Sequence, residues 1–267
     1  MLPTLRLCRS LLFLPASNPR AIDKARGLAA DMIFLDLEDA VKPEDKQSAR
    51  QAALAAAQEG FVGRPVAIRV NKVGDPWHDE DVDAVVASAA GFMIVPKVQS
   101  AEEIEAIADA GMPVLAMIET AAGVLDARRI AAASAGVIAG TNDLAADLGI
   151  PPGSGRAGLL HSLQAIVLAA RAAGVAAFDG VYNRLEDDAG LAIECEEGRA
   201  FGFDGKTLIH PSQIETANRI FGPSAEEVDA ARRLVAAATG GAERFEGRMI
   251  EAMHVEQARA LLARARA

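Results

Sequence analysis

The chain has 267 residues, of which 51% are hydrophobic, and a formal net charge of −10. No apolar run approaches the roughly 18 residues that a membrane-spanning helix needs, so we expect no membrane partner. Acidic and basic residues are interspersed without a basic stripe, which argues against binding of nucleic acid. The two cysteines, Cys8 and Cys195, are too few for a disulfide framework and indicate a reducing compartment, so we predict a cytoplasmic protein. Residues 1–17 could pass for a weak signal peptide, but residues 10–15 also have the pattern of a buried strand.

Eight short apolar runs recur along the chain, separated by alanine-rich segments with helical periodicity. The runs cover residues 10–15, 32–37, 66–71, 92–98, 114–119, 136–141, 176–182 and 205–210. Strands that are apolar on both faces and alternate with helices are typical of a parallel sheet. Eight such units predict an α/β fold, a (β/α)8 TIM barrel. We assign residues 1–222 to the barrel and residues 223–267 to a C-terminal helical extension that packs on the barrel or on a neighbouring subunit.

An open doubly wound sheet is the alternative architecture. The first turn carries no G-x-G-x-x-G motif, which such sheets use to bind dinucleotides. Polar residues also end nearly every predicted strand rather than one pair of strands. In a barrel, active-site groups sit at the carboxyl ends of many strands. This distribution favours the barrel.

Glu119 and Asp143 are the first candidate functional residues. Glu119 follows the apolar run "VLAMI", and Asp143 follows the next run. An ionised carboxylate is costly to bury without a partner, whereas two carboxylates together with water oxygens suit Mg²⁺. The alternative is that Glu119 pairs with a nearby Arg or Lys and that Asp143 caps the following helix. The sequence pattern alone supports these two interpretations about equally.

Arg69 lies in an apolar run, so its guanidinium needs an anionic partner. That partner is either a structural carboxylate, such as Asp36 or Glu38 of the neighbouring strand, or a bound carboxylate or enolate. Strand alternation places Asp36 and Glu38 on one face, where they can hydrogen-bond to metal-bound water or to Arg69. Lys97 follows the fourth run and is less specific, because a solvated or ion-paired lysine is at least as frequent there.

The remaining strand ends carry Asp179, the pair Tyr182 and Asn183, and His210. The roles of Tyr182 and Asn183 stay open, and a lone histidine such as His210 is more often structural than catalytic. The four histidines of the chain lie far apart in sequence without metal-ligand spacing, so a zinc site is not expected.

Motifs in the same order along the chain carry a family resemblance: "RSLLFLPASNP", "IFLDLEDAV", "IRVN", "VPKV", "MIET", "GTNDLA", "DGVYN" and "GFDGKTLIHPSQI". Together they resemble the citrate lyase β-subunit-like branch of the HpcH/HpaI aldolase/citrate lyase family, which includes malyl-CoA and citramalyl-CoA lyases. The resemblance runs from Arg9 to about Ala260. It implies a Mg²⁺-dependent (β/α)8 barrel, usually a trimer, that cleaves or forms a carbon–carbon bond in acyl-CoA thioesters.

The resemblance also assigns roles to residues of the matching motifs. It implies that Glu119 of "MIET" and Asp143 of "GTNDLA" are the Mg²⁺ ligands. Arg69 of "IRVN" would bind the oxo acid and stabilise the enolate. Asp36 and Glu38 of "LDLED" would organise metal-bound waters at the substrate site.

The chain departs from the family pattern at two positions, one expected to contact CoA and one in the C-terminal lid that covers the site of a neighbouring subunit. Lys24 falls where a basic residue of the family meets CoA phosphates, but Asn18 replaces a CoA-contacting Arg, for which Arg20 could compensate. Relatives with a C-terminal lid present an Asp to the neighbouring subunit within a segment like "GKMIDMP". This chain reads "GRMIEAM", which places Glu251 at that position. Glu251 is therefore the predicted proton-transfer residue, acting from a neighbouring subunit.

The predicted function is Mg²⁺-dependent cleavage or formation of a 3-hydroxyacyl-CoA-type thioester, such as citramalyl-CoA, malyl-CoA or a citryl thioester. The products of cleavage are an acetyl thioester and a 2-oxo acid. Two alternatives keep the same site: an aldolase acting on free 2-oxo acids, and a malyl-CoA thioesterase. A third is a subunit without independent turnover in a citrate lyase-like complex. We expect a homo-oligomer, either a trimer or a hexamer.

Overall fold

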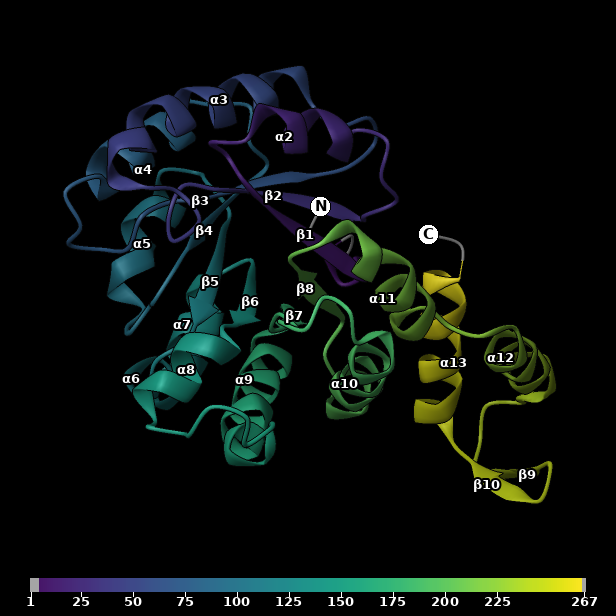
Figure 1. Cartoon of the computed structure of the whole chain (residues 1–267). Helices are drawn as coiled ribbons and strands as arrows, with labels where there is room; N and C mark the ends of the chain where they lie inside the picture. Colours follow the sequence, from purple (N-terminus) through teal and green to yellow (C-terminus); the bar gives the residue numbers. More distant parts are fainter. Residues whose placement is uncertain (1–4, 266–267) are drawn as a thin grey trace.

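The computed structural model describes residues 5–265, and its centre is a closed barrel of parallel strands in the order β1 to β8 (Figure 1). The barrel strands are β1 (Ser10–Pro15), β2 (Met32–Asp36), β3 (Val66–Arg69), β4 (Phe92–Val95), β5 (Val114–Ile118), β6 (Gly136–Ala139), β7 (Ala176–Asp179) and β8 (Gly205–Leu208). Pairing of β1 with β8 closes the barrel, with Leu11 opposite Thr207. The predicted fold class is confirmed, and every predicted apolar run contains one strand.

Helices surround the barrel on its outside (Figure 1). They are α2 (Pro19–Ala25), α3 (Lys46–Glu59), α4 (His78–Val86), α5 (Glu102–Asp109), α6 (Ala121–Leu125), α7 (Ala127–Ala133), α8 (Thr141–Asp147), α9 (Leu160–Ala173), α10 (Asp188–Phe201) and α11 (Ile214–Phe221). In residues 5–265, no helix combines the length and the apolar character needed to cross a membrane.

Two apolar clusters explain why the strands are hydrophobic on both faces. One fills the barrel interior, with Phe34, Met117 and Phe178 among its buried members. The other lies between the strands and the helices and contains most of the remaining core. Because the strands pack against an apolar cluster on each face, most of their residues form continuous apolar runs rather than an alternating pattern.

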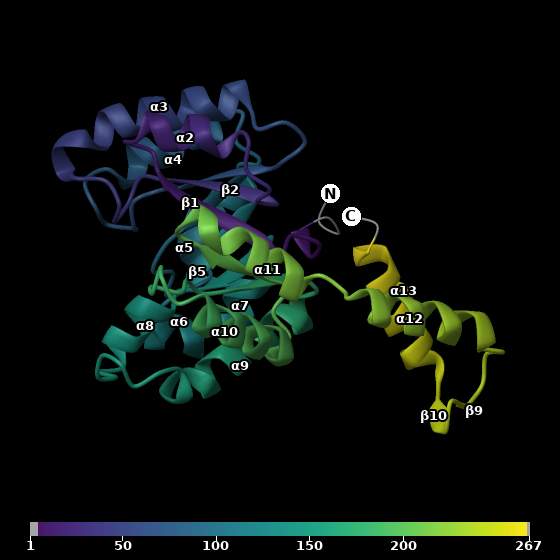
Figure 2. The same ribbon diagram turned by 45° about the vertical axis from the view of Figure 1, so that its right-hand side comes forward.

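The C-terminal arm, residues 225–264, stands away from the barrel (Figure 2). It consists of α12 (Ala225–Ala237), the antiparallel hairpin β9 (Glu243–Phe245) and β10 (Arg248–Ile250), and α13 (Ala252–Arg264). Arg264 ties its end to the barrel, because the guanidinium donates to the backbone oxygens of Arg6 and Asp204 at 2.7 Å each. The division of the chain at residue 222 into barrel and extension stays a prediction.

Candidate active site

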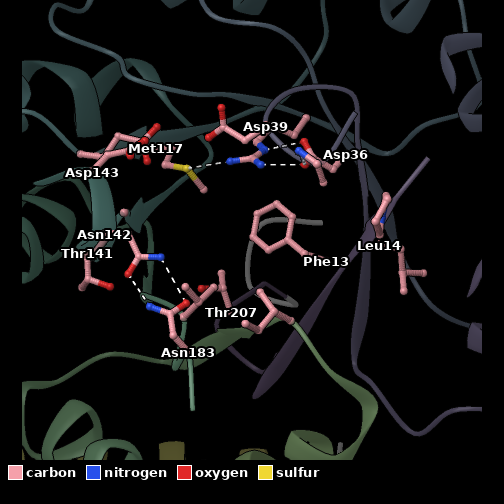
Figure 3. A pocket seen from close by; sticks show the side chains of 18 residues that line it. Phe13, Leu14, Asp36, Asp39, Met117, Thr141, Asn142, Asp143, Asn183 and Thr207 are labelled. Carbon is pink, nitrogen blue, oxygen red and sulfur yellow. Dashed lines mark hydrogen bonds and ion pairs between the residues drawn. The ribbon is translucent and has the colours of Figure 1, made fainter. Parts of the chain in front are cut away.

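A cavity of about 410 Å³ opens at the carboxyl ends of the barrel strands (Figure 3). Residues of every barrel strand or of the loop after it, except β4, line the cavity: Phe13, Leu14, Pro15, Asp36, Asp39, Ala40, Arg69, Met117, Glu119, Ala139, Gly140, Thr141, Asn142, Asp143, Val181, Asn183, Thr207 and Ile209. Four residues predicted from the sequence, Asp36, Arg69, Glu119 and Asp143, are among them. The predicted convergence of strand ends on one mouth is therefore present.

Glu119 follows β5 directly, and its side chain is buried. Its Oε1 accepts a hydrogen bond of 2.8 Å from the backbone N–H of Lys97. The partner of this carboxylate is therefore a backbone amide rather than the cationic side chain of the alternative interpretation. A β-carbon at Gly140 would overlap the Glu119 carboxylate, so glycine at that position leaves the space that the carboxylate occupies.

Asp143 lies in the first turn of α8, and 40% of its side chain is exposed. The N-cap of this helix is Gly140, and no side chain caps it. The alternative role of Asp143 as the helix cap is therefore not the one that the structure shows. Its Oδ2 instead lies 3.2 Å from the ammonium group of Lys97.

Arg69 ends β3 directly opposite Asp36 of β2. Its Nε and one terminal nitrogen donate to the two oxygens of Asp36, at 2.6 and 2.7 Å. Glu38 Oε2 lies 3.0 Å from the other terminal nitrogen, and the Phe13 ring lies 4.9 Å below the guanidinium. Burial alone would lower the pKa of Arg69, but Asp36 and Glu38 outweigh it and hold this pKa above its ordinary value. Of the partners that the sequence allowed for Arg69, the structure therefore shows the carboxylates of Asp36 and Glu38. Arg69 also lines the cavity.

Lys97 occupies the centre of the carboxylate cluster, a position that the sequence did not single out. Its backbone has a φ of 52°, a conformation that non-glycine residues rarely adopt. Its ammonium lies 2.6 Å from Glu38 Oε1 and 3.4 Å from Asp39 Oδ2, besides its contact with Asp143. The same residue therefore contacts Glu119 through its backbone and the other acids through its side chain.

Asn142 and Asn183 form a reciprocal amide pair at the edge of the cavity (Figure 3). Their two hydrogen bonds measure 2.7 and 3.3 Å. Tyr182, in contrast, donates to Asp187 at 2.6 Å and supports the loop before α10. His210 has a structural contact, because its ring nitrogen Nδ1 lies 2.8 Å from the Ser212 hydroxyl. Of these four residues, only Asn142 and Asn183 line the cavity.

Asp179 was grouped with the converging strand ends, but the structure places it elsewhere. Its carboxylate is fully buried and bonds to Lys206 at 2.9 Å and to Arg156 at 2.6 Å. Lys206 is also fully buried and donates to Glu194 of α10 at 2.7 Å. Because neighbouring Thr207 lines the cavity, strand alternation turns Lys206 toward the surrounding helices. This ion cluster is structural.

Three predicted site residues, Glu38, Lys24 and Glu251, are not among those that line the cavity, although Glu38 contacts Arg69. Lys24 is exposed near the end of α2, and Asn18 caps the start of that helix by accepting a bond of 3.1 Å from the N–H of Ala21. Glu251 is exposed between β10 and α13 in the C-terminal arm, away from the barrel (Figures 1 and 2). Their roles stay predictions.

Family models match almost the whole chain. Residues 9–211 match the HpcH/HpaI aldolase/citrate lyase model, and residues 159–267 match a model described as a C–C bond lyase of the TIM-barrel fold. The chain belongs to the HpcH/HpaI aldolase/citrate lyase family. The resemblance predicted from the motifs is therefore confirmed, and the protein is an enzyme of the carbon–carbon lyase type.

Individual relatives are similar over nearly their full length. The chain is 44% identical to a (3S)-malyl-CoA thioesterase of Cereibacter sphaeroides over 97% of this chain and 95% of the relative. It is 35% identical to a citrate lyase subunit beta-like protein of Deinococcus radiodurans, with 96% of each chain covered. The solved structure of CitE from Mycobacterium tuberculosis in complex with magnesium, acetoacetate and coenzyme A is 34% identical, with a TM-score of 0.85 and coverage of 98% of this chain and 100% of that one.

The donor set at the cavity fits the Mg²⁺ expected from the family. Glu119 and Asp143 supply carboxylate oxygens, and a magnesium ion held by few carboxylates keeps several waters or substrate oxygens. Glu38 Oε2 is buried and lacks a partner with hydrogen-bond geometry, so it can accept a bond from such a water. Within residues 5–265, no group of three or more His, Cys, Asp or Glu side chains is arranged around a metal position.

The ionisation of Glu119 leads to a pH-dependent prediction. Burial, together with Glu38 and Asp143, raises its pKa from 4.5 to about 8 against the opposing effect of Arg69. Between these values the folded, metal-free protein holds a proton that the unfolded chain releases, so its stability falls as the pH rises through this window. Mg²⁺ needs the carboxylate, so its affinity should fall up to about tenfold per pH unit below pH 8, with release of about one proton.

Isothermal titration of Mg²⁺ at pH 6, 7 and 8, in buffers of different ionisation enthalpy, measures both quantities. A Glu119→Gln variant is the control in which proton release should disappear. An affinity that stays constant from pH 6 to 8 would contradict the assignment of Glu119 as a ligand that must lose its proton.

Proposed function

We propose that the enzyme is Mg²⁺-dependent and acts on the thioester of a 3-hydroxy acid that carries a carboxylate on the carbinol carbon, with malyl-CoA as the first substrate to test. The proposed reaction is cleavage to acetyl-CoA and glyoxylate. The observation that supports it most is the grouping of the Glu119 and Asp143 carboxylates with the guanidinium of Arg69, whose side chain is 12% exposed, in one cavity. The CitE structure with magnesium and coenzyme A supports the same assignment by similarity.

Each residue has a separate task in this proposal. Glu119 and Asp143 would hold Mg²⁺, which would supply a Lewis acid for the oxygens of the 2-oxo acid. Arg69 offsets the negative charge that develops on the thioester oxygen as the carbon–carbon bond breaks and an enolate forms, an electrostatic effect that is usually large. Asp36 and Glu38 keep the guanidinium in place.

The proton balance needs one acid–base group. Cleavage removes a proton from the hydroxyl group of the substrate and adds one to the methylene carbon of the leaving enolate. Glu251 of a neighbouring subunit is the group that we propose for this transfer. It is exposed in the arm, beside Met249 and Met253, whose exposed fractions are 68% and 53%.

A hydrolytic outcome is the second candidate, favoured by the 44% identity to the (3S)-malyl-CoA thioesterase. Hydrolysis of malyl-CoA would give malate and free coenzyme A from the same site. Lys24, exposed on α2, is the proposed contact for the phosphates of the carrier in either reaction.

Product analysis separates the two reactions. The enzyme is incubated with malyl-CoA and Mg²⁺, glyoxylate is trapped as its phenylhydrazone, and free thiol is measured in a parallel sample. Glyoxylate formed with an equal amount of acetyl-CoA supports cleavage, whereas malate with an equal amount of thiol supports hydrolysis. The absence of Mg²⁺-dependent products from malyl-CoA and citramalyl-CoA would overturn the proposed substrate class.

Mixing of inactive variants tests the proposed oligomer and the role of Glu251 in trans. Glu119→Gln and Glu251→Gln each lack one function, and in a trimer or hexamer a mixed interface can pair an intact metal site with an intact Glu251. We expect each variant alone to be inactive and the mixture, after subunit exchange, to regain about a quarter of the activity or more. Light scattering should show an oligomer. No recovery in exchanged oligomers would contradict the action of Glu251 in trans, and an active Glu251→Gln variant would place Glu251 outside the reaction.

A further inference from the structure

Lys46 is a buried lysine whose contacts differ from those of an ordinary ion pair. It begins α3, and only 6% of it is exposed. Its ammonium donates to the backbone oxygens of Leu37 at 2.6 Å and Glu38 at 2.7 Å. The third acceptor is Oδ1 of Asn71, at 2.6 Å. All three donors of the ammonium are therefore used, and two of them hold the backbone of one short loop.

That loop, residues 37–40, carries Glu38 to its contacts with Arg69 and Lys97 beside the cavity. From the inner side, the two oxygens of Asp36 accept hydrogen bonds from the N–H groups of Glu38 at 2.9 Å and Ala40 at 3.1 Å. From the outer side, Lys46 binds the carbonyl groups. The donors and acceptors of the loop backbone are thus engaged from two directions by buried side chains.

Asn71, which accepts the third hydrogen bond from Lys46, is itself held by neighbouring side chains. The side-chain and backbone N–H groups of Asn71 donate to Asp81 at 2.5 and 3.1 Å. Asp81 is buried and pairs with Arg50 at 2.6 Å. Lys46 therefore connects the loop after β2 to a hydrogen-bonded group of side chains from α3, α4 and the segment after β3.

We propose that Lys46 is a positioning residue of the reaction, which fixes the backbone of residues 37–38 so that the Glu38 carboxylate stays between Lys97 and Arg69. The Glu38 oxygens lie 2.6 Å from the Lys97 ammonium and 3.0 Å from the Arg69 guanidinium. The Arg69 guanidinium is part of the cavity wall, and the Lys97 ammonium lies in the carboxylate cluster. A displaced Glu38 would therefore change the charge around the reacting oxygens. This inference rests on the proposed function, because its kinetic consequence is measured in that reaction.

Replacement of Lys46 by Met removes the three donors while it preserves the length and apolar stem of the side chain. We expect kcat to fall by about 10- to 100-fold, the usual cost of losing a group that orients the immediate contacts of a metal or substrate. Lys42→Met is the matched control: it removes the same charge from an exposed side chain four residues away, and kcat should stay within about twofold. Lys46→Arg, which keeps donors and charge, should recover part of the loss.

A double-variant cycle separates positioning from general stability. If Lys46 acts through Glu38, Lys46→Met should lower kcat by the full 10- to 100-fold in the wild-type background. In a Glu38→Gln background it should lower kcat by less than about twofold, because the effects of coupled residues are not additive. Equal losses of kcat in both backgrounds would overturn the proposal. Should Lys46→Met not fold, Lys46→Gln, whose amide keeps two donors, gives the same comparison.

Hydrogen exchange provides a readout that does not depend on turnover. In Lys46→Met, the amides of Glu38 and Ala40 should exchange at least about tenfold faster than in wild type, while Lys42→Met leaves them unchanged. Unchanged exchange in Lys46→Met would overturn the positioning role. Failure of wild type to convert any thioester would instead refute the proposed function and leave this exchange result to decide the role of Lys46.

Discussion

Replacement of Glu119 by Gln will reduce turnover by at least about a thousandfold. The amide cannot supply the anionic oxygen that Mg²⁺ needs, and loss of the metal removes several kcal/mol of transition-state stabilisation. Gln has nearly the same shape as Glu, so it fits the space left by Gly140. Because burial raises the pKa of Glu119 to about 8, a neutral side chain removes an unfavourable buried charge in alkaline solution. The metal-free variant should therefore melt no lower than wild type.

Steady-state kinetics at saturating Mg²⁺, together with thermal unfolding, test this expectation. Glu196→Gln is the matched control, because Glu196 is exposed on α10 and its replacement should leave both quantities unchanged. Asp143→Asn should resemble Glu119→Gln. Retention of Mg²⁺-dependent turnover within about tenfold by a folded Glu119→Gln protein would refute the metal assignment.

Replacement of Lys206 by Met will destabilise the barrel by about 3–5 kcal/mol, because removal of one partner leaves buried charge uncompensated. Lys206 and Asp179 are both 0% exposed, and their charged atoms lie 2.9 Å apart. Arg156 remains beside Asp179, but Glu194 loses its contact with Lys206. The cluster joins β7 and β8 to α10, so its loss weakens the packing of that helix.

Urea unfolding followed by circular dichroism measures this change. Lys72→Met is the comparison variant: Lys72 is half exposed and lies 3.8 Å from Asp75, and such pairs contribute at most about 1 kcal/mol. The double variant Lys206→Met with Asp179→Asn should recover part of the stability. A loss below about 1 kcal/mol for Lys206→Met would contradict the account of a coupled buried cluster.

The barrel itself could be predicted from the sequence because its physical cause is local. Each strand contacts an apolar cluster on both faces, and this requirement is visible as a continuous apolar run. Seven of the eight runs were longer than their strands, however: the third run reached Asn71, whereas β3 ends at Arg69. At that point the chain leaves the sheet, and Asn71 bonds to Asp81 rather than to a neighbouring strand. Such a side-chain contact has no periodic signal.

The positions of Glu119, Asp143 and Arg69 around one cavity were also predictable, since active-site groups of a barrel lie at the carboxyl ends of its strands. Lys97 was not singled out, because its importance depends on a left-handed backbone and on a side chain that reaches Glu38 and Asp143 across the cavity. Asp179 was wrongly grouped with the residues that face the cavity. Its position at the end of a strand does not show on which face of the sheet its side chain lies. Its partner Lys206 is 27 positions away, beyond the range of any local pattern.

The location of a bound divalent ion tests the central claim most directly. Mn²⁺ is accepted by carboxylate sites that bind Mg²⁺ and can be located by its anomalous X-ray scattering. A crystal of the protein soaked in Mn²⁺ should show one strong anomalous peak within roughly 2.0–2.3 Å of oxygens of both Glu119 and Asp143. A peak elsewhere in the cavity, or none at these carboxylates under saturating Mn²⁺, would contradict the proposed metal site and the mechanism built on it.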